Sequence, residues 1–118
     1  MRRRTESVSI TATTLAGLIP EGRKNAISKK YLIAVADDLG LVHSKDRERE
    51  VRKLISEARF AGCPILYNTE TGGYYRPTKE EIAELRAYIK AEEHRAKTVL
   101  ASLNSAKDLL SDLERGVY

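Results

Sequence analysis

The chain has 118 residues, 42% of them hydrophobic and 32% charged, and its formal net charge is +4. This length fits one domain, and no apolar run approaches the roughly 18 residues that a membrane span needs. The basic N-terminus has no apolar segment behind it, and the single cysteine, Cys63, cannot form an internal disulfide. We therefore expect a cytoplasmic protein that does not enter a membrane.

The predicted elements begin after a polar, basic stretch over 1–9, which we expect to be a flexible arm. The apolar segment 10–19 predicts a first helix, and 26–28 predicts a short strand. A second helix is expected over 29–40, with Ser28 as its N-terminal cap.

A third helix is predicted over 46–61, and two apolar-aromatic runs around a glycine-rich centre then predict a hairpin that ends near residue 77. We expect Ile65, Tyr67 and one of Tyr74 and Tyr75 to pack on the domain. Thr78 and Glu81 form a T-x-x-E capping box, which predicts a long helix from residue 78 onward.

Net charge differs between the two parts of the chain. Residues 1–77 hold 14 Lys and Arg and 9 Asp and Glu, a net charge of +5. Residues 78–118 hold 7 and 8, a net charge of −1. A partner that carries phosphates would therefore meet the first part.

This order of elements, with "EVRKLISEARFAGCPIL" followed by "GGYYRP", resembles winged helix-turn-helix DNA-binding proteins of bacterial, prophage and phage genomes. The resemblance is strongest over about 20–77. It implies a mainly α fold with a small β-hairpin: a winged-helix domain over 10–77, followed by a long C-terminal helix over 78–118. It also implies double-stranded DNA as partner and a role as transcriptional regulator. A phage replication or recombination accessory protein and a winged-helix module that binds protein remain as alternatives.

The third helix has two faces of different character. Its apolar residues recur at i, i+3, i+4 and i+7 and predict the core face: Val51, Leu54, Ile55 and Ala58. The same spacing on the opposite side gives three cations and a hydroxyl: Arg49, Arg52, Lys53 and Ser56. Such a row suits a DNA major groove, although an ordinary solvated surface has the same pattern.

Four residues outside this helix complete the predicted DNA contacts: Lys45, Gly72, Gly73 and Arg76. In a winged helix the hairpin lies beside the recognition helix, so its arginine and glycine N–H groups are candidates for phosphate contact. Glu70 opposes this prediction because a carboxylate repels phosphate, and a purely structural hairpin is the alternative. The arginines at 2–4 form a further candidate phosphate-binding arm.

The last helix carries a heptad pattern. Nine of the ten a and d positions between Ile82 and Leu113 are apolar, and Glu92 is the exception. This pattern predicts helix pairing, and we expect a homodimer through Val99, Leu103, Ala106, Leu110 and Leu113. The alternative is a helix that bends back or packs on the first helix.

Catalytic chemistry has little support. His43 and His94 have no metal-ligand spacing with Cys63, and no glycine-rich phosphate loop is present. We expect no enzyme activity, cofactor, metal or small-molecule ligand.

Overall fold

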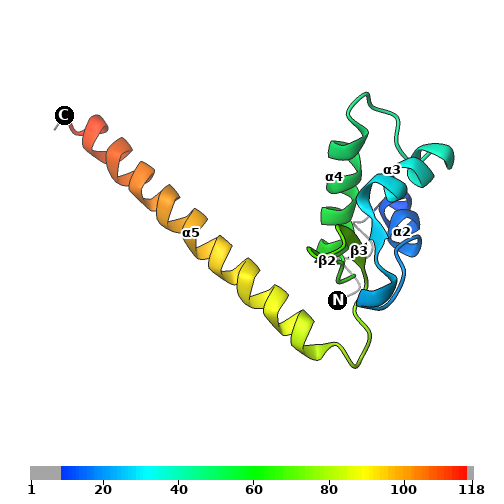
Figure 1. Ribbon diagram of the computed structural model, residues 1–118. Coiled ribbons are helices and arrows are strands. Elements are labelled where there is room, and N and C mark those ends of the chain that lie inside the picture. Colours follow the sequence, from blue (N-terminus) through cyan, green and yellow to red (C-terminus); the bar gives the residue numbers. More distant parts are fainter. Residues whose placement is uncertain (1–8, 117–118) are drawn as a thin grey trace. The chain divides into compact units, whose positions relative to one another are not determined.

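The structure is a computed structural model in which residues 9–116 are described (Figure 1). The predicted basic arm therefore lies outside the described residues, apart from Ser9. The chain divides into two units, 1–85 and 86–118. We describe each unit by itself.

Within residues 9–81, the first unit contains the helices α2 (Ile10–Gly17), α3 (Lys29–Asp38) and α4 (Arg47–Phe60) and the short 3-10 helix η1 (Arg23–Asn25). Each α-helix begins after a side chain that accepts a hydrogen bond from the backbone N–H three residues later: Ser9, Ser28 and Asp46. Such caps satisfy N–H groups that have no partner inside the helix. The predicted cap at Ser28 is confirmed.

A three-stranded antiparallel sheet contains β1 (Ile27–Ser28), β2 (Leu66–Asn68) and β3 (Gly73–Tyr75) in the order β1-β3-β2. The predicted short strand thus joins the predicted hairpin. A Cβ atom at Gly73 would lie 2.7 Å from the Ile27 carbonyl oxygen, so the close approach of β1 to β3 requires glycine there. The structure confirms the prediction that the chain is mainly helical, with a small sheet and a long C-terminal helix.

The core of the first unit lies between the three α-helices and the sheet (Figure 1). Residues from every α-helix and from the hairpin are buried in it, including Leu15, Leu32, Ile55, Ile65 and Tyr74. The prediction for the tyrosines was wrong in part. Tyr74 and Tyr75 are both buried, whereas Tyr67 is 42% exposed.

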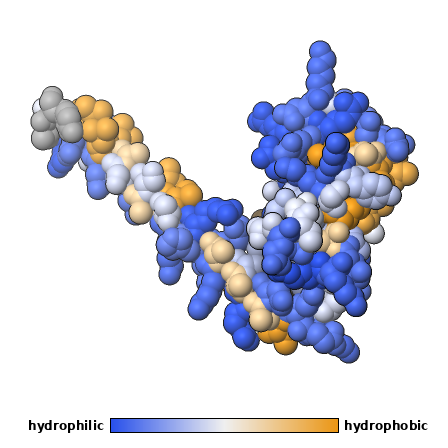
Figure 2. Space-filling model, in the orientation of Figure 1, coloured by the Kyte–Doolittle hydropathy of each residue, from blue (hydrophilic) through white to orange (hydrophobic). Residues whose placement is uncertain are grey.

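Helix α5 (Ile82–Glu114) begins in the first unit and forms the second unit from Arg86 onward, and its 33 residues span about 50 Å at 1.5 Å per residue. No described residue of α5 is buried, and the helix is uninterrupted from Ile82 to Glu114. Figure 2 shows hydrophobic residues along one edge of α5 and hydrophilic residues along the other. Within residues 9–116, no helix is long and apolar enough to cross a membrane.

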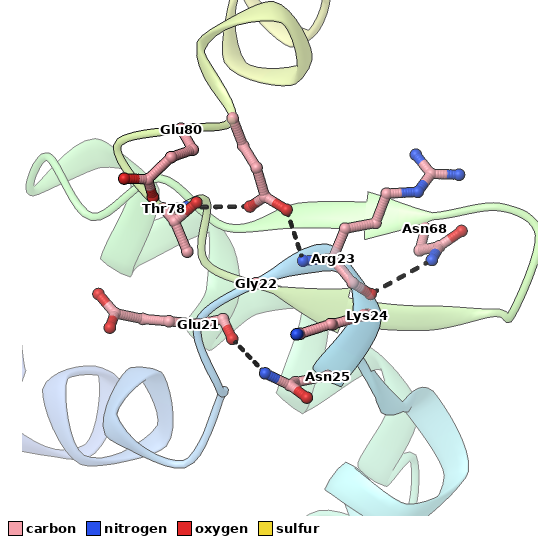
Figure 3. A pocket seen from close by; sticks show the side chains of 9 residues that line it. Glu21, Gly22, Arg23, Lys24, Asn25, Asn68, Thr78 and Glu80 are labelled. Atoms are coloured by element: carbon pink, nitrogen blue, oxygen red, sulfur yellow. Dashed lines mark hydrogen bonds between the residues drawn. The ribbon is translucent and has the colours of Figure 1, made fainter.

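The start of α5 differs from the prediction, because the helix begins at Ile82 and not at Thr78. Glu81 accepts hydrogen bonds from the backbone N–H groups of Thr78 and Arg23, each at 2.9 Å (Figure 3). These N–H groups, that of Arg23 first, lower the pKa of the Glu81 carboxyl. The Glu81 carboxylate therefore links η1 to the segment after the hairpin by hydrogen bonds.

Candidate functional site

Helix α4 presents two faces, as its sequence predicted. All four predicted core residues are buried: Val51, Leu54, Ile55 and Ala58. The four residues of the opposite face are exposed: Arg49, Arg52, Lys53 and Ser56. We call these four exposed residues the α4 row. The row stands on a rigid support, because the other side of the same helix is packed in the core.

The acidic residues of α4 are all engaged within the first unit. Glu48 pairs with the Lys29 ammonium at 2.9 Å. Glu50 accepts hydrogen bonds from the backbone N–H groups of His43 and Ser44, each at 2.8 Å. Glu57 accepts a hydrogen bond from the Ser9 hydroxyl at 3.0 Å.

The pKa shifts of two of these carboxyls follow from their partners. The hydrogen bond from Lys29 lowers the pKa of Glu48, and the N–H groups of Ser44 and His43 lower that of Glu50. By contrast, Arg49, Arg52 and Lys53 form no ion pair with any residue of the described part. The α4 row is therefore a group of three cations whose neighbouring carboxylates have other partners.

The hairpin places an aromatic pair near this positive charge. The rings of Tyr67 and Tyr74 meet edge to face, with their centroids 5.1 Å apart. Burial raises the pKa of the Tyr74 hydroxyl, and nearby cations, including Lys29 and Arg52, oppose that rise. The half-exposed Tyr67 lies near Lys29 of α3. Sequence reasoning missed Tyr67 as a surface residue, although the alternation of Leu66, Tyr67 and Asn68 contained that signal.

The predicted contacts in the hairpin have other roles in the structure. The Gly72 N–H donates to the Asn68 carbonyl at 2.7 Å, so the turn itself uses this donor. Gly73 is buried in β3. The Arg76 Nε donates to the Ile19 carbonyl at 2.7 Å and holds this side chain at the base of the hairpin. None of these three residues extends the α4 row at the hairpin turn.

The remaining predictions for this region concern charge. Lys45 is exposed in the connection that precedes α4. Glu70, the carboxylate that opposed the prediction of phosphate contact, pairs with the Arg23 guanidinium. The arginines at 2–4 lie outside the described residues. The hairpin turn is therefore less acidic than its sequence indicates.

A shallow hollow of about 490 Å³ lies elsewhere on the first unit (Figure 3). Its lining includes Glu21, Arg23, Lys24, Asn25 and Glu81. Its polar groups bond to one another: the Asn25 amide donates to the Glu21 carbonyl at 3.0 Å, and Glu81 holds two N–H groups. We therefore interpret the hollow as the place where η1 and the segment after the hairpin are held together by hydrogen bonds. No cluster of metal-ligating side chains occurs within residues 9–116.

The predicted dimerisation residues are all exposed on α5: Val99, Leu103, Ala106, Leu110 and Leu113. Leu100 and Leu109 are also exposed, at 58% and 44%, so the apolar surface is wider than the a and d positions alone.

Comparisons of the chain with protein families, curated proteins and solved structures gave no match.

Proposed function

We propose that the first unit is a winged helix-turn-helix domain that binds double-stranded DNA, and that the protein is a sequence-specific transcriptional regulator. In this proposal α3 and α4 are the helix-turn-helix pair, α4 is the recognition helix, and the hairpin of β2 and β3 is the wing. The strand order β1-β3-β2 supports the assignment, because it joins the strand before α3 to the hairpin after α4.

The main support for the proposal is that the α4 carboxylates have hydrogen-bond and ion-pair partners away from the α4 row. A solvated helix face would be expected to pair its cations with acidic residues one turn away. Here Glu48, Glu50 and Glu57 are directed to Lys29, to a loop and to Ser9 instead. The cations of the α4 row are thereby left for an external polyanion, and arginine and lysine suit both guanine edges and phosphates.

The hairpin contributes differently from the prediction. We propose that Tyr67, together with Lys29 near it, faces the DNA backbone beside the major groove. A tyrosine hydroxyl can donate to a phosphate oxygen, so Tyr67 takes the role that the sequence suggested for Arg76. Lys45, at the N-terminal side of α4, is a further candidate phosphate contact.

A DNA titration tests the proposal. The variant Arg52→Glu/Lys53→Glu should bind duplex DNA on the order of 100-fold more weakly than the parent. The slope of log K against log salt should fall by about two, because two cations no longer meet phosphate or base. Fluorescence anisotropy with random and genomic duplexes at two salt concentrations measures both quantities.

A matched control separates the row from overall charge. Lys24→Glu/Lys79→Glu makes the same charge change at two exposed positions of the first unit that are outside the row. This control should bind DNA within a few-fold of the parent. Equal losses in the two variants would contradict the assignment of the row. Equal affinity for all duplexes would favour a replication or recombination accessory role, and no DNA binding would leave the protein-binding module.

The second part of the proposal concerns α5. We propose that its exposed apolar residues pair with a second copy of the chain, so that the protein binds DNA as a homodimer. The absence of any buried residue along α5 supports this, because a contiguous apolar stripe on a single helix usually marks an interaction surface.

A further inference from the structure

The apolar surface of α5 has a width and a charge pattern that go beyond a simple heptad seam. With Ile82 at position a, Leu100 falls at position e and Leu109 at position g, on opposite borders of the seam. Position e also holds Arg86, Glu93, Lys107 and Glu114. These flanking residues distinguish the two possible orientations of a helix pair, because they meet different partners in each.

A parallel pair fits these residues poorly. It would place each d residue against the same residue of the second copy, so two Glu92 carboxylates would face each other within the seam. Position g would meet position e of the next heptad, which sets Arg95 against Leu100 and Leu109 against Glu114. No flanking pair of opposite charge is formed, and two apolar side chains meet charged ones.

An antiparallel pair centred at residue 101 fits them well. Position a then faces position d of the second copy, and residues whose numbers sum to 202 lie level. The layers are Ile89 with Leu113, Glu92 with Leu110, Ala96 with Ala106, and Val99 with Leu103, each occurring twice by symmetry. The two Glu92 carboxylates are far apart, and each is held by Arg95 of its own helix at 3.0 Å. Ile82 and Leu85 fall outside the pair, and both belong to the first unit.

The e flank of this register is complementary in charge, whereas the g flank, with residue numbers that sum to 204, sets Arg95 against Leu109. Position e faces position e, with residue numbers that sum to 200. Arg86 therefore meets Glu114, and Glu93 meets Lys107. Leu100 meets its own copy at the centre, which accounts for its exposed apolar side chain. Each ion pair occurs twice by symmetry.

The neighbouring antiparallel registers are disfavoured by the same side chains. A shift of one heptad in one direction would bring Arg86 against Lys107. A shift in the other direction would bring Glu93 against Glu114. Like charges at facing positions destabilise a pair, so charge selects one register of the three.

From these facing residues we infer that α5 binds a second copy of itself in antiparallel orientation, centred at residue 101. The two first units then attach at opposite ends of the helix pair. Residue 82 lies 19 residues from the centre, so the two α5 N-termini are about 57 Å apart at 1.5 Å per residue. The inference rests on the proposed pairing of α5 and is independent of DNA binding.

Chemical crosslinking of the full chain tests the orientation. Single cysteines are introduced after Cys63→Ser and treated with a short bismaleimide. Ser102→Cys should crosslink, because position g meets position g near the centre only in the antiparallel pair. Ile89→Cys should not, because its two copies lie about 36 Å apart there, whereas they touch in a parallel pair. Ala101→Cys, at the outward f position, is the matched control and should not crosslink in either orientation.

Charge exchange tests the register. Lys107→Glu should weaken the dimer about tenfold by sedimentation equilibrium, because two attractive pairs become repulsive. Adding Glu93→Lys to this variant should restore the parent affinity. A monomer or a trimer for the parent chain, crosslinking of Ile89→Cys without Ser102→Cys, or no rescue by the double exchange would overturn the inference. No DNA is present, so failure here is distinguishable from failure of the α4 row to bind DNA.

Discussion

The two units use similar apolar side chains in opposite ways. In the first unit, Leu32 and Ile65 are fully buried, whereas Leu103 and Leu110 of α5 are 50% and 54% exposed. The first unit therefore gains stability from its own core. Helix α5 has only local sources: strong helix formers, no glycine or proline, and short-range ion pairs such as Arg95 with Glu92. The difference is that the apolar side chains of the first unit contact one another in a core, whereas those of α5 are exposed.

The largest expected effect compares one residue from each unit. Ile55→Ala should destabilise the first unit by about 2–5 kcal/mol, because it leaves a cavity in the core. Leu103→Ala should leave that unit unchanged and weaken only self-association. Urea unfolding followed by near-ultraviolet circular dichroism of the buried tyrosines measures the first effect, and sedimentation measures the second. A loss of first-unit stability in Leu103→Ala would mean that α5 packs on the core.

Periodicity predicted the packed face of α4 correctly. The four apolar residues of α4 share one face, and the sequence alone placed all four in the core. The hydrogen bonds of the Glu81 carboxylate could not be predicted in this way. The T-x-x-E pattern fits a capping box, and Glu81 does accept the Thr78 N–H, but its second donor, the Arg23 N–H, lies 58 residues away in sequence, and the helix begins at Ile82. Contacts at this sequence separation leave no local signal.

The α4 row was predictable for the same reason as the core face. The partners of the neighbouring carboxylates could not be predicted from the sequence. The partner of Glu48 comes from α3, and that of Glu57 is the residue before α2. The pairing of Glu70 with Arg23 is likewise a tertiary contact. A charge count along the helix therefore underestimates how much positive charge its surface presents.

The second prediction concerns the close approach of the strands, which only the first unit contains. Gly73→Ala should destabilise that unit by about 1–3 kcal/mol, because the new Cβ meets the Ile27 carbonyl oxygen at 2.7 Å and β1 must shift. Gly17→Ala is the matched control, since a Cβ there meets nothing within 4 Å. The control should be neutral or slightly stabilising in the same urea experiment. Equal effects at the two glycines would contradict the observed strand pairing.

A smaller effect is expected at a helix cap. Ser28→Ala removes the hydroxyl that accepts the Tyr31 N–H at 3.1 Å and should cost about 1 kcal/mol in the first unit. Ser105→Ala changes the same residue type on α5, where the side chain is exposed, and should leave first-unit unfolding unchanged. Thermal unfolding of both variants checks the pair. A shift of similar size in each would show that the two units unfold together.

The smallest expected effect is the acid sensitivity of the first unit. The pKa values of the Glu50 and Glu81 carboxyls lie below their ordinary value of 4.5, because backbone N–H groups stabilise the charged forms. A carboxyl whose folded pKa is lowered contributes stability that is present above its unfolded pKa and is lost as pH falls through the folded pKa. The unfolding midpoint should therefore decrease below about pH 4.5.

Glu50→Gln and Glu81→Gln should each be slightly less stable at pH 7 and should show a smaller decrease in acid, since glutamine cannot be protonated there. Glu80→Gln, an exposed neighbour of Glu81, should keep the full decrease. Urea unfolding at pH 7, 5, 4 and 3 distinguishes these curves, and an undiminished acid decrease in the Glu50→Gln/Glu81→Gln double variant would contradict the assignment.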